Sequence, residues 1–138
     1  MRRLLLLPLL LALGWSVPAS AGPVDGLWLT DDRRGVVRIG PCGAHLCGWI
    51  ARVLARGPGV PDRDVNNPEP RLRGRTLLGL PILSGFTAAG AGFTGGQAYD
   101  PQSGRSYTAR LSPNADGSLT VTGCVLFICQ SKRWTRLR

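Results

Sequence analysis

The sequence predicts an all-β protein, a small eight-stranded antiparallel up-and-down β-barrel with one long loop between strands three and four. After the first 21 residues, apolar side chains recur with a period of two rather than that of a helix. Connections such as "DPQSG" and "PNADG" are rich in residues that accept turn geometry, so neighbouring strands should pair as hairpins. Eight strands in meander order can close into a barrel, which removes both exposed edges.

The same pattern sets the order of elements, with residues 55–80 as the long loop. The expected strands are Leu27–Thr30, Gly35–Gly40, Leu46–Leu54, Pro81–Phe86, Gly92–Tyr99, Arg105–Leu111, Ser118–Cys124 and Gln130–Leu137.

Residues 1–21 predict a cleaved secretory signal peptide. Two arginines precede a leucine-rich run, and the segment ends in the small residues Ala19-Ser20-Ala21. The apolar run is shorter than the ~20 residues that span a bilayer and contains Pro8. No cysteine marks a lipid-anchored form. Residues 22–138 have the length of one domain with one core, and we expect them in the periplasm or secreted.

The mature chain is still basic: loss of the two arginines of the signal peptide lowers the formal charge only from +9 to +7. An exported basic protein meets anionic lipid surfaces or acidic ligands rather than nucleic acid. The arginines are scattered along the sequence, which is typical of a solvated surface and leaves a dedicated anion site as the second interpretation.

Alternation places aromatic rings and small residues together inside the barrel. An eight-stranded barrel is just wide enough to be filled by side chains or to hold one small ligand, and packing is the more common outcome. With Arg52 outward, the residues expected to point inward are Trp49, Ala51, Val53, Phe93, Gln97, Tyr99, Tyr107, Ala109, Leu111, Leu119 and Val121.

The long loop begins polar, basic and proline-marked in "DVNNPEPRLRGR" and turns apolar in "TLLGLPILSGF". Successive connections of a meander alternate between the barrel ends, so this loop shares one end with "DDRR", "DPQSG" and "CVLFIC". We expect a lid or rim there, with Arg73 or Arg75 at the rim. Asp64 and Glu69 should form salt bridges with nearby arginines rather than a catalytic pair.

Four cysteines in an exported chain allow three pairings. Cys42 and Cys47 fall in the second connection, and Cys124 and Cys129 in the seventh, at the opposite end of the barrel. Bridges between these pairs would exceed disulfide reach, so we expect Cys42–Cys47 and Cys124–Cys129. Each closes a small loop and should stabilise the fold by only about 2 kcal/mol.

The sequence contains few features that are typical of a metal site or of an enzyme. His45 lies between two cysteines, but a zinc site needs about four ligands, and an oxidising compartment favours the disulfide. No metal or cofactor is therefore expected. The chain has no G-x-S-x-G elbow, phosphate-binding glycine loop or C-x-x-C pair, which favours a role other than catalysis.

Several segments resemble known families. "GLWLT" carries Gly26-x-Trp28, and "WTRLR" places Arg136 in the last strand, as in lipocalins and calycins, where an early tryptophan packs against a late arginine at the closed end. "GLWLT", "PCGAHLCGWI", "DVNNPEPRLRGRTLLGLPIL", "GGQAYDPQSGRSYTARL" and "RWTR" resemble, in order, the bacterial domain-of-unknown-function family 2147. The resemblance implies an exported calycin/lipocalin-like barrel in which Trp28 and Arg136 are structural, and it implies no activity.

Two functional hypotheses follow for an exported envelope protein. In the first, the barrel binds a small apolar or amphipathic ligand, with an anionic head group as one form. The cavity would be lined by Trp49, Tyr99 and Tyr107, with Arg73 or Arg75 at the head group.

In the second hypothesis, a filled barrel acts as a protein-protein interaction or scaffold module through its loop rim. The contact with an envelope protein would be the run Val125-Leu126-Phe127-Ile128. Alternatively, this run folds back under the long loop. Peripheral contact with an anionic membrane surface is a third alternative.

Overall fold

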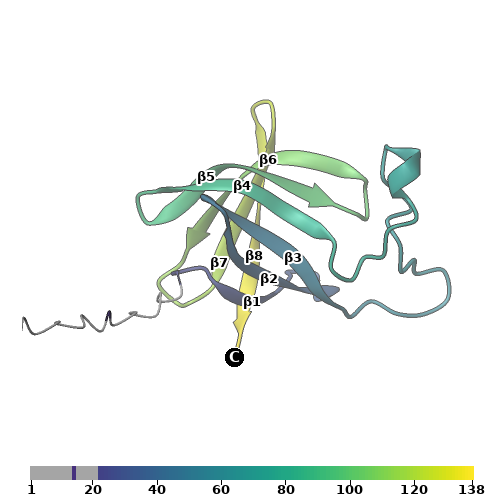
Figure 1. Cartoon of the computed structure of the whole chain (residues 1–138), viewed down its shortest axis with the longest axis horizontal. Helices are drawn as coiled ribbons and strands as arrows, with labels where there is room; N and C mark the ends of the chain where they lie inside the picture. The colour runs from purple at the N-terminus through teal and green to yellow at the C-terminus, as the bar shows by residue number, and fades with distance from the viewer. Residues whose placement is uncertain (1–13, 15–21) are drawn as a thin grey trace, which may run out of the picture.

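The computed structural model describes Gly14 and residues 22–138, so the predicted signal peptide, apart from Gly14, lies outside the described residues. The chain forms a closed antiparallel barrel of eight strands in sequence order, with the first strand paired to the last (Figure 1). The strands are β1 (Gly26–Leu29), β2 (Gly35–Cys42), β3 (His45–Val53), β4 (Pro81–Ala89), β5 (Gly92–Asp100), β6 (Arg105–Pro113), β7 (Leu119–Val125) and β8 (Ile128–Leu137). The predicted up-and-down barrel with its long loop is confirmed.

The long loop between β3 and β4 contains one 3-10 turn, η1 (Pro70–Leu72), and the described residues form no α-helix. Accordingly, none of the described segments is a helix with the length and apolar character needed to cross a membrane. Meander order places this loop at the same barrel end as the β1–β2, β5–β6 and β7–β8 connections. We call this end the mouth and the other end the closed end.

The closed end is packed with side chains. Trp28 is 1% exposed, and its indole N–H donates to the carbonyl of Val24 at 2.9 Å. The guanidinium carbon of Arg136 lies 4.3 Å from the ring centroid of Trp28. Its two terminal nitrogens donate to the carbonyls of Asp25 and Pro23, each at 2.8 Å. Arg136 therefore ties the last strand to the segment that enters the barrel.

Glycine-containing irregularities bend β4 and β5. Gly85 and Gly95 have φ values of 73° and 70°, in the left-handed region that glycine tolerates. In β4, Leu83 and Phe86 are both buried although they are three residues apart. The ring of Phe86 packs directly on Gly96, where any Cβ would overlap it. The bends let one phenylalanine fill the interior beneath β5.

The predicted inward orientation of Trp49 is wrong. Trp49 pairs with Arg38, whose strand neighbours Val37 and Ile39 are buried, so Arg38 and Trp49 share the outer face. The guanidinium carbon of Arg38 lies 5.4 Å from the Trp49 ring centroid. The register then shifts by one residue at Ala51 because Val37 pairs with Ile50 and Val36 with Arg52.

Two of the three orientations predicted for β5 are also wrong. Phe93 pairs with inward-facing Leu111 and packs against the core, as expected. The register shifts between Phe93 and Gly96, so Gln97 and Tyr99 lie on the outer face and Ala98 points inward. A strictly alternating pattern cannot show such a bulge.

Candidate functional site

The mouth half of the barrel holds a cavity of about 600 Å³. Its walls are mainly apolar and include Val37, Ile50, Ile82, Leu83, Ala98 and Val121. The long loop closes over part of it with Val60, Pro61 and Leu77. The barrel is thus filled at the closed end and open at the mouth, and the cavity has the size of typical small-molecule sites.

One face of β8 contributes both an aromatic and polar groups to this cavity. Gln130, Lys132 and Trp134 line it, and Arg136 continues the same alternation down to the closed end. Trp134 is 7% exposed and lies between the packed core and the cavity. These three residues were not predicted from the sequence, although counting back by twos from Arg136 leads to each of them.

The tyrosines predicted to bind a ligand lie in different places. Tyr107 lines the cavity and packs beside Gly123, where an added Cβ would lie 3.2 Å from the Tyr107 Cβ. Tyr99 borders the mouth, but its hydroxyl points into the long loop and donates to Asp64 at 2.6 Å. Trp49 does not contribute to the cavity among the lining residues described.

The carboxylates at the mouth are already engaged. Asp31 pairs with Lys132 at 3.4 Å, and Asp100 accepts hydrogen bonds from the backbone N–H of Gln102 and the Ser103 hydroxyl. Burial alone would raise the pKa of Asp32. Hydrogen bonds from Thr30, the Arg34 backbone and Gln102, together with the Arg34 charge, nevertheless hold this pKa below its usual value.

Basic side chains at the mouth are less fully committed. Arg34, Arg52, Arg63 and Lys132 all border the cavity. Within residues 22–138, no ion pair or side-chain hydrogen bond engages the guanidinium of Arg52, which is exposed. Arg52 pairs with Val36, the neighbour of inward-facing Val37, so its side chain leaves the outer face of β3 as expected and offers a cation at the rim of the mouth.

A buried carboxylate orders the long loop. Asp64 is 0% exposed and accepts hydrogen bonds from the Tyr99 hydroxyl at 2.6 Å, the Asn67 amide at 2.7 Å and Arg75 at 3.2 Å. The Arg73 Nε donates to the Asn67 carbonyl at 2.7 Å. Arg73 and Arg75 thus serve the loop itself, and neither lines the cavity.

The loop also docks on the β5–β6 turn. The Asn66 amide donates to the carbonyls of Pro101 and Gln102 at 3.2 and 2.9 Å. The backbone of Asn66 approaches Gly104 so closely that any side chain at 104 would overlap it. Gln102 in turn donates to Asp32 at 2.9 Å, so three mouth connections form one hydrogen-bonded layer.

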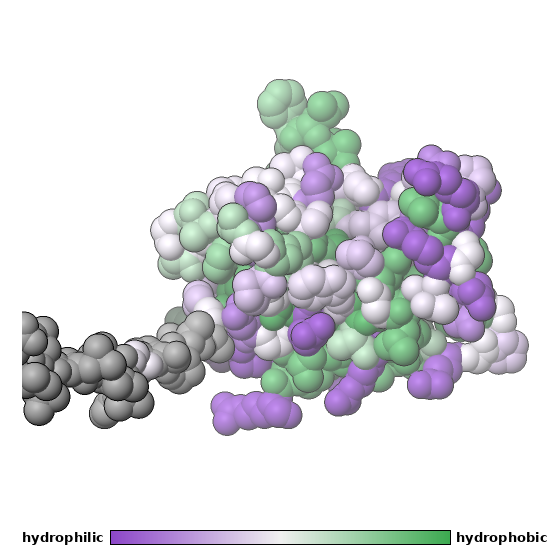
Figure 2. Space-filling model, viewed as in Figure 1, coloured by the Kyte–Doolittle hydropathy of each residue, from purple (hydrophilic) through white to green (hydrophobic). Residues whose placement is uncertain are grey.

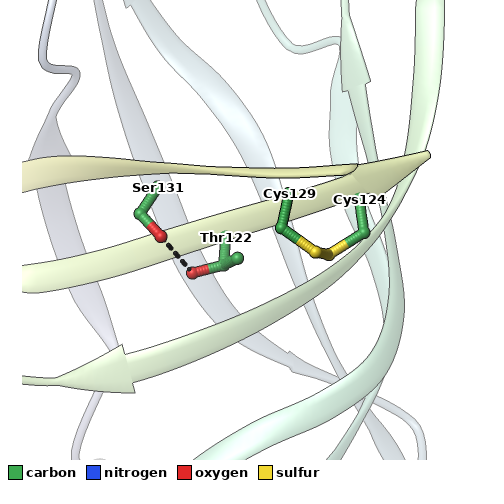
Figure 3. Close-up of a disulfide and its surroundings, with 4 residues drawn as sticks. All are labelled: Thr122, Cys124, Cys129 and Ser131. Atoms are coloured by element: carbon green, nitrogen blue, oxygen red, sulfur yellow. Dashed lines mark hydrogen bonds between the residues drawn. A yellow bond between two sulfur atoms is a disulfide. The ribbon is translucent and has the colours of Figure 1, made fainter. Parts of the chain in front are cut away.

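The two predicted disulfides, Cys42–Cys47 and Cys124–Cys129, are confirmed. The second one joins β7 to β8 next to a hydrogen bond between Thr122 and Ser131 (Figure 3). His45 is exposed in the β2–β3 hairpin, and no group of three or more metal-binding side chains occurs among the residues that the structure describes.

The apolar run beyond this disulfide is exposed. Val125, Leu126, Phe127 and Ile128 have exposed fractions of 50%, 90%, 100% and 78%. The alternative that these side chains fold back under the long loop is therefore wrong.

The closed meander, the Trp28–Arg136 contact and the open cavity together define a lipocalin-like barrel. The chain belongs to the bacterial family described as "Uncharacterized protein conserved in bacteria (DUF2147)", which matches residues 26–136.

A solved structure described as "Protein HP1028 from the human pathogen Helicobacter pylori belongs to the lipocalin family" is similar, with a TM-score of 0.72 and 22% sequence identity over 83% of each chain. At this identity the likeness shows the fold alone. The chain matches no curated protein at a significant level.

Proposed function

We propose that this protein is a non-enzymatic binding protein of the bacterial envelope whose barrel takes a small amphipathic ligand. The apolar part would occupy the cavity, and an anionic head group would lie at the mouth. The observation that carries this proposal is the cavity of about 600 Å³, with apolar walls and a partly uncommitted basic mouth.

The proposed location outside the cytoplasm is supported by the disulfides and by the predicted signal peptide. Two disulfides indicate an oxidising compartment outside the cytoplasm, and the family is bacterial. The signal-like sequence of residues 1–21 supports the periplasm or secretion as the destination.

The apolar part of the ligand would contact Trp134, Tyr107 and Val121 on the inner wall. These residues belong to the adjacent strands β6, β7 and β8, whose backbone is held in a continuous ladder. A cavity on such a rigid wall is largely preformed, so binding requires little ordering of the protein. Trp134 takes the aromatic role that was predicted for Trp49.

The head group would contact Arg52 and Lys132. Arg52 has no ion-pair partner within residues 22–138, and Lys132 forms an ion pair with Asp31 at 3.4 Å. The neighbouring carboxylates accept hydrogen bonds from the protein, which reduces their repulsion of an anion. A ligand with an alkyl chain and a carboxylate or sulfonate at one end would match the apolar cavity and the basic mouth.

The cavity can be tested with matched variants in β5. Ala98 lines the cavity, whereas its neighbour Gln97 is exposed on the outer face. The probe is anilinonaphthalene sulfonate, an anionic amphipath whose fluorescence rises in apolar surroundings. Ala98→Phe should weaken binding at least roughly tenfold by occupying the cavity. Gln97→Phe should bind like the unmodified protein, and equal binding by both variants would place the probe elsewhere.

The head-group contact needs a separate comparison. A fatty acid and the alcohol of equal chain length compete with the probe, and Arg52→Gln should weaken only the acid, by roughly three- to tenfold. Arg110→Gln, on the exposed outer face of β6, removes the same charge away from the mouth. If Arg110→Gln has the same effect, the attraction comes from net charge and not from a built contact.

A further inference from the structure

The tip of the β7–β8 hairpin, residues 125–128, is a continuous exposed apolar surface. The other exposed large apolar residues, Leu54, Val65 and Leu78, lie singly in or beside the long loop. The tip extends away from the barrel body in Figure 1, and Figure 2 shows hydrophobic residues gathered on this projection. Side chains so placed would be covered only by something outside the protomer.

The hairpin holds these side chains in place. Val125 pairs with Ile128, and the Cys124–Cys129 bridge directly behind them spans a Cα–Cα distance of 4.1 Å. The Thr122–Ser131 hydrogen bond of 2.9 Å is a further side-chain link between β7 and β8, next to the disulfide (Figure 3). Little conformational freedom remains for binding to remove.

The turn itself has an unusual composition. Leu126 has a φ of 54°, a left-handed conformation that tight hairpin turns usually assign to asparagine, aspartate or glycine. Here the two turn positions carry leucine and phenylalanine, both almost completely exposed. A strained backbone that displays two large apolar side chains to solvent points to a binding role rather than to stability.

Basic residues lie on the strands and the turn near the base of the hairpin. Lys132 lies four positions beyond Ile128, or about 13 Å along an extended strand, and its side chain faces the cavity. Its ion pair with Asp31 brings the β1–β2 turn, which contains exposed Arg33, to the same level. Exposed Arg105 begins β6, the strand that flanks β7. Apolar side chains thus project from a part of the surface that exposes Arg33 and Arg105, which we call the basic girdle, while Asp31 is paired with Lys132.

We propose that this tip inserts into an anionic phospholipid bilayer, with the basic girdle at the level of the phosphates. Interfacial elements bury their apolar residues roughly 5–10 Å deep, and cations behind them meet anionic head groups. The tip is a narrow projection with polar and basic surroundings, whereas a stable protein interface needs about 800 Å² of complementary surface on each partner. This inference does not depend on what the cavity binds.

The test is co-sedimentation of the mature protein with vesicles of phosphatidylglycerol and phosphatidylethanolamine, compared with vesicles of phosphatidylcholine. Phe127→Asp removes the fully exposed side chain and adds a negative charge. Leu78→Asp is the control, since it also replaces an exposed large apolar side chain with aspartate, at a 60% exposed position in the long loop. Circular dichroism and thermal unfolding establish that both variants keep the barrel.

The expected result is binding to the phosphatidylglycerol vesicles that Phe127→Asp weakens at least roughly tenfold and Leu78→Asp leaves within about twofold. Failure of the unmodified protein to bind these vesicles would overturn the proposal, as would equal binding by Phe127→Asp. If vesicles are not bound and Phe127→Asp instead converts a dimer to a monomer in analytical ultracentrifugation, the tip contacts a second copy and not a bilayer.

Discussion

Replacing Asp64 with alanine should release the long loop while leaving the barrel folded. Asp64 accepts three side-chain hydrogen bonds, from Tyr99, Asn67 and Arg75, and is completely buried. The Tyr99 bond is the one that crosses from the loop to the barrel wall. The strand ladder around the barrel does not include Asp64, so the change should act locally.

The magnitude follows from those contacts. Removing one member of a buried, charged hydrogen-bonded group costs about 3–5 kcal/mol, and part of this is recovered because Tyr99 and Arg75 can be rehydrated. A net loss of about 3 kcal/mol raises the open population of the loop roughly 100-fold. Tyr99→Phe removes one of the three bonds and should raise it only about tenfold.

Hydrogen exchange measured by mass spectrometry reads this opening directly. The amides of Asp64, Asn67 and Leu77 donate to loop carbonyls and should exchange faster in Asp64→Ala. Amides in the β6–β7 ladder should keep their rates. Asp116→Ala is the control, since it removes an exposed carboxylate that pairs with Arg133 at 3.0 Å. Equal acceleration in loop and barrel would refute the reasoning, because Asp64 would then support the whole fold.

Three further outcomes are expected. Burial, reinforced by the adjacent carboxylate, raises the pKa of Tyr99 to about 12. The hydrogen bond of the Tyr99 hydroxyl should therefore stabilise the fold fully below pH ~10 and should be lost as pH rises through about 12. An ultraviolet titration should show a late tyrosine transition that Tyr99→Phe removes. Gly96→Ala should lower the free energy of unfolding in urea by about 1–3 kcal/mol, because the new Cβ overlaps the Phe86 ring, and an unchanged midpoint would contradict that packing. Replacing Cys124 and Cys129 with serine should cost about 2 kcal/mol in the same assay without unfolding the barrel, whereas loss of the cooperative transition would make the bridge essential.

The strand order and the disulfides could be predicted because they depend on local pattern. Alternation and short turns fix a meander, and a meander separates the two cysteine pairs to opposite ends. The orientation of Trp49 could also have been predicted. The tight Cys42–His45 hairpin sets Gly40 opposite Cys47 and Arg38 opposite Trp49, which places the tryptophan on the arginine's face.

Other features depend on information that local pattern does not contain. The shift between Phe93 and Gly96 reverses the faces of β5, and a glycine in a strand permits such a bulge without requiring it. Asp64 and Tyr99 are 35 positions apart, so their contact follows from how the loop folds back over the mouth. The sequence indicated an ordered loop but not the buried carboxylate that orders it.

Native mass spectrometry of the protein, expressed from its full sequence in a bacterium and purified without detergent, tests the central claim of an occupied cavity most directly. We predict a noncovalent adduct that denaturation releases and that Gln97→Phe retains but Ala98→Phe loses. Its released mass would identify the ligand class. An adduct carried equally by both variants, or a bare chain that remains bare when a fatty acid is added, would contradict the proposed binding function.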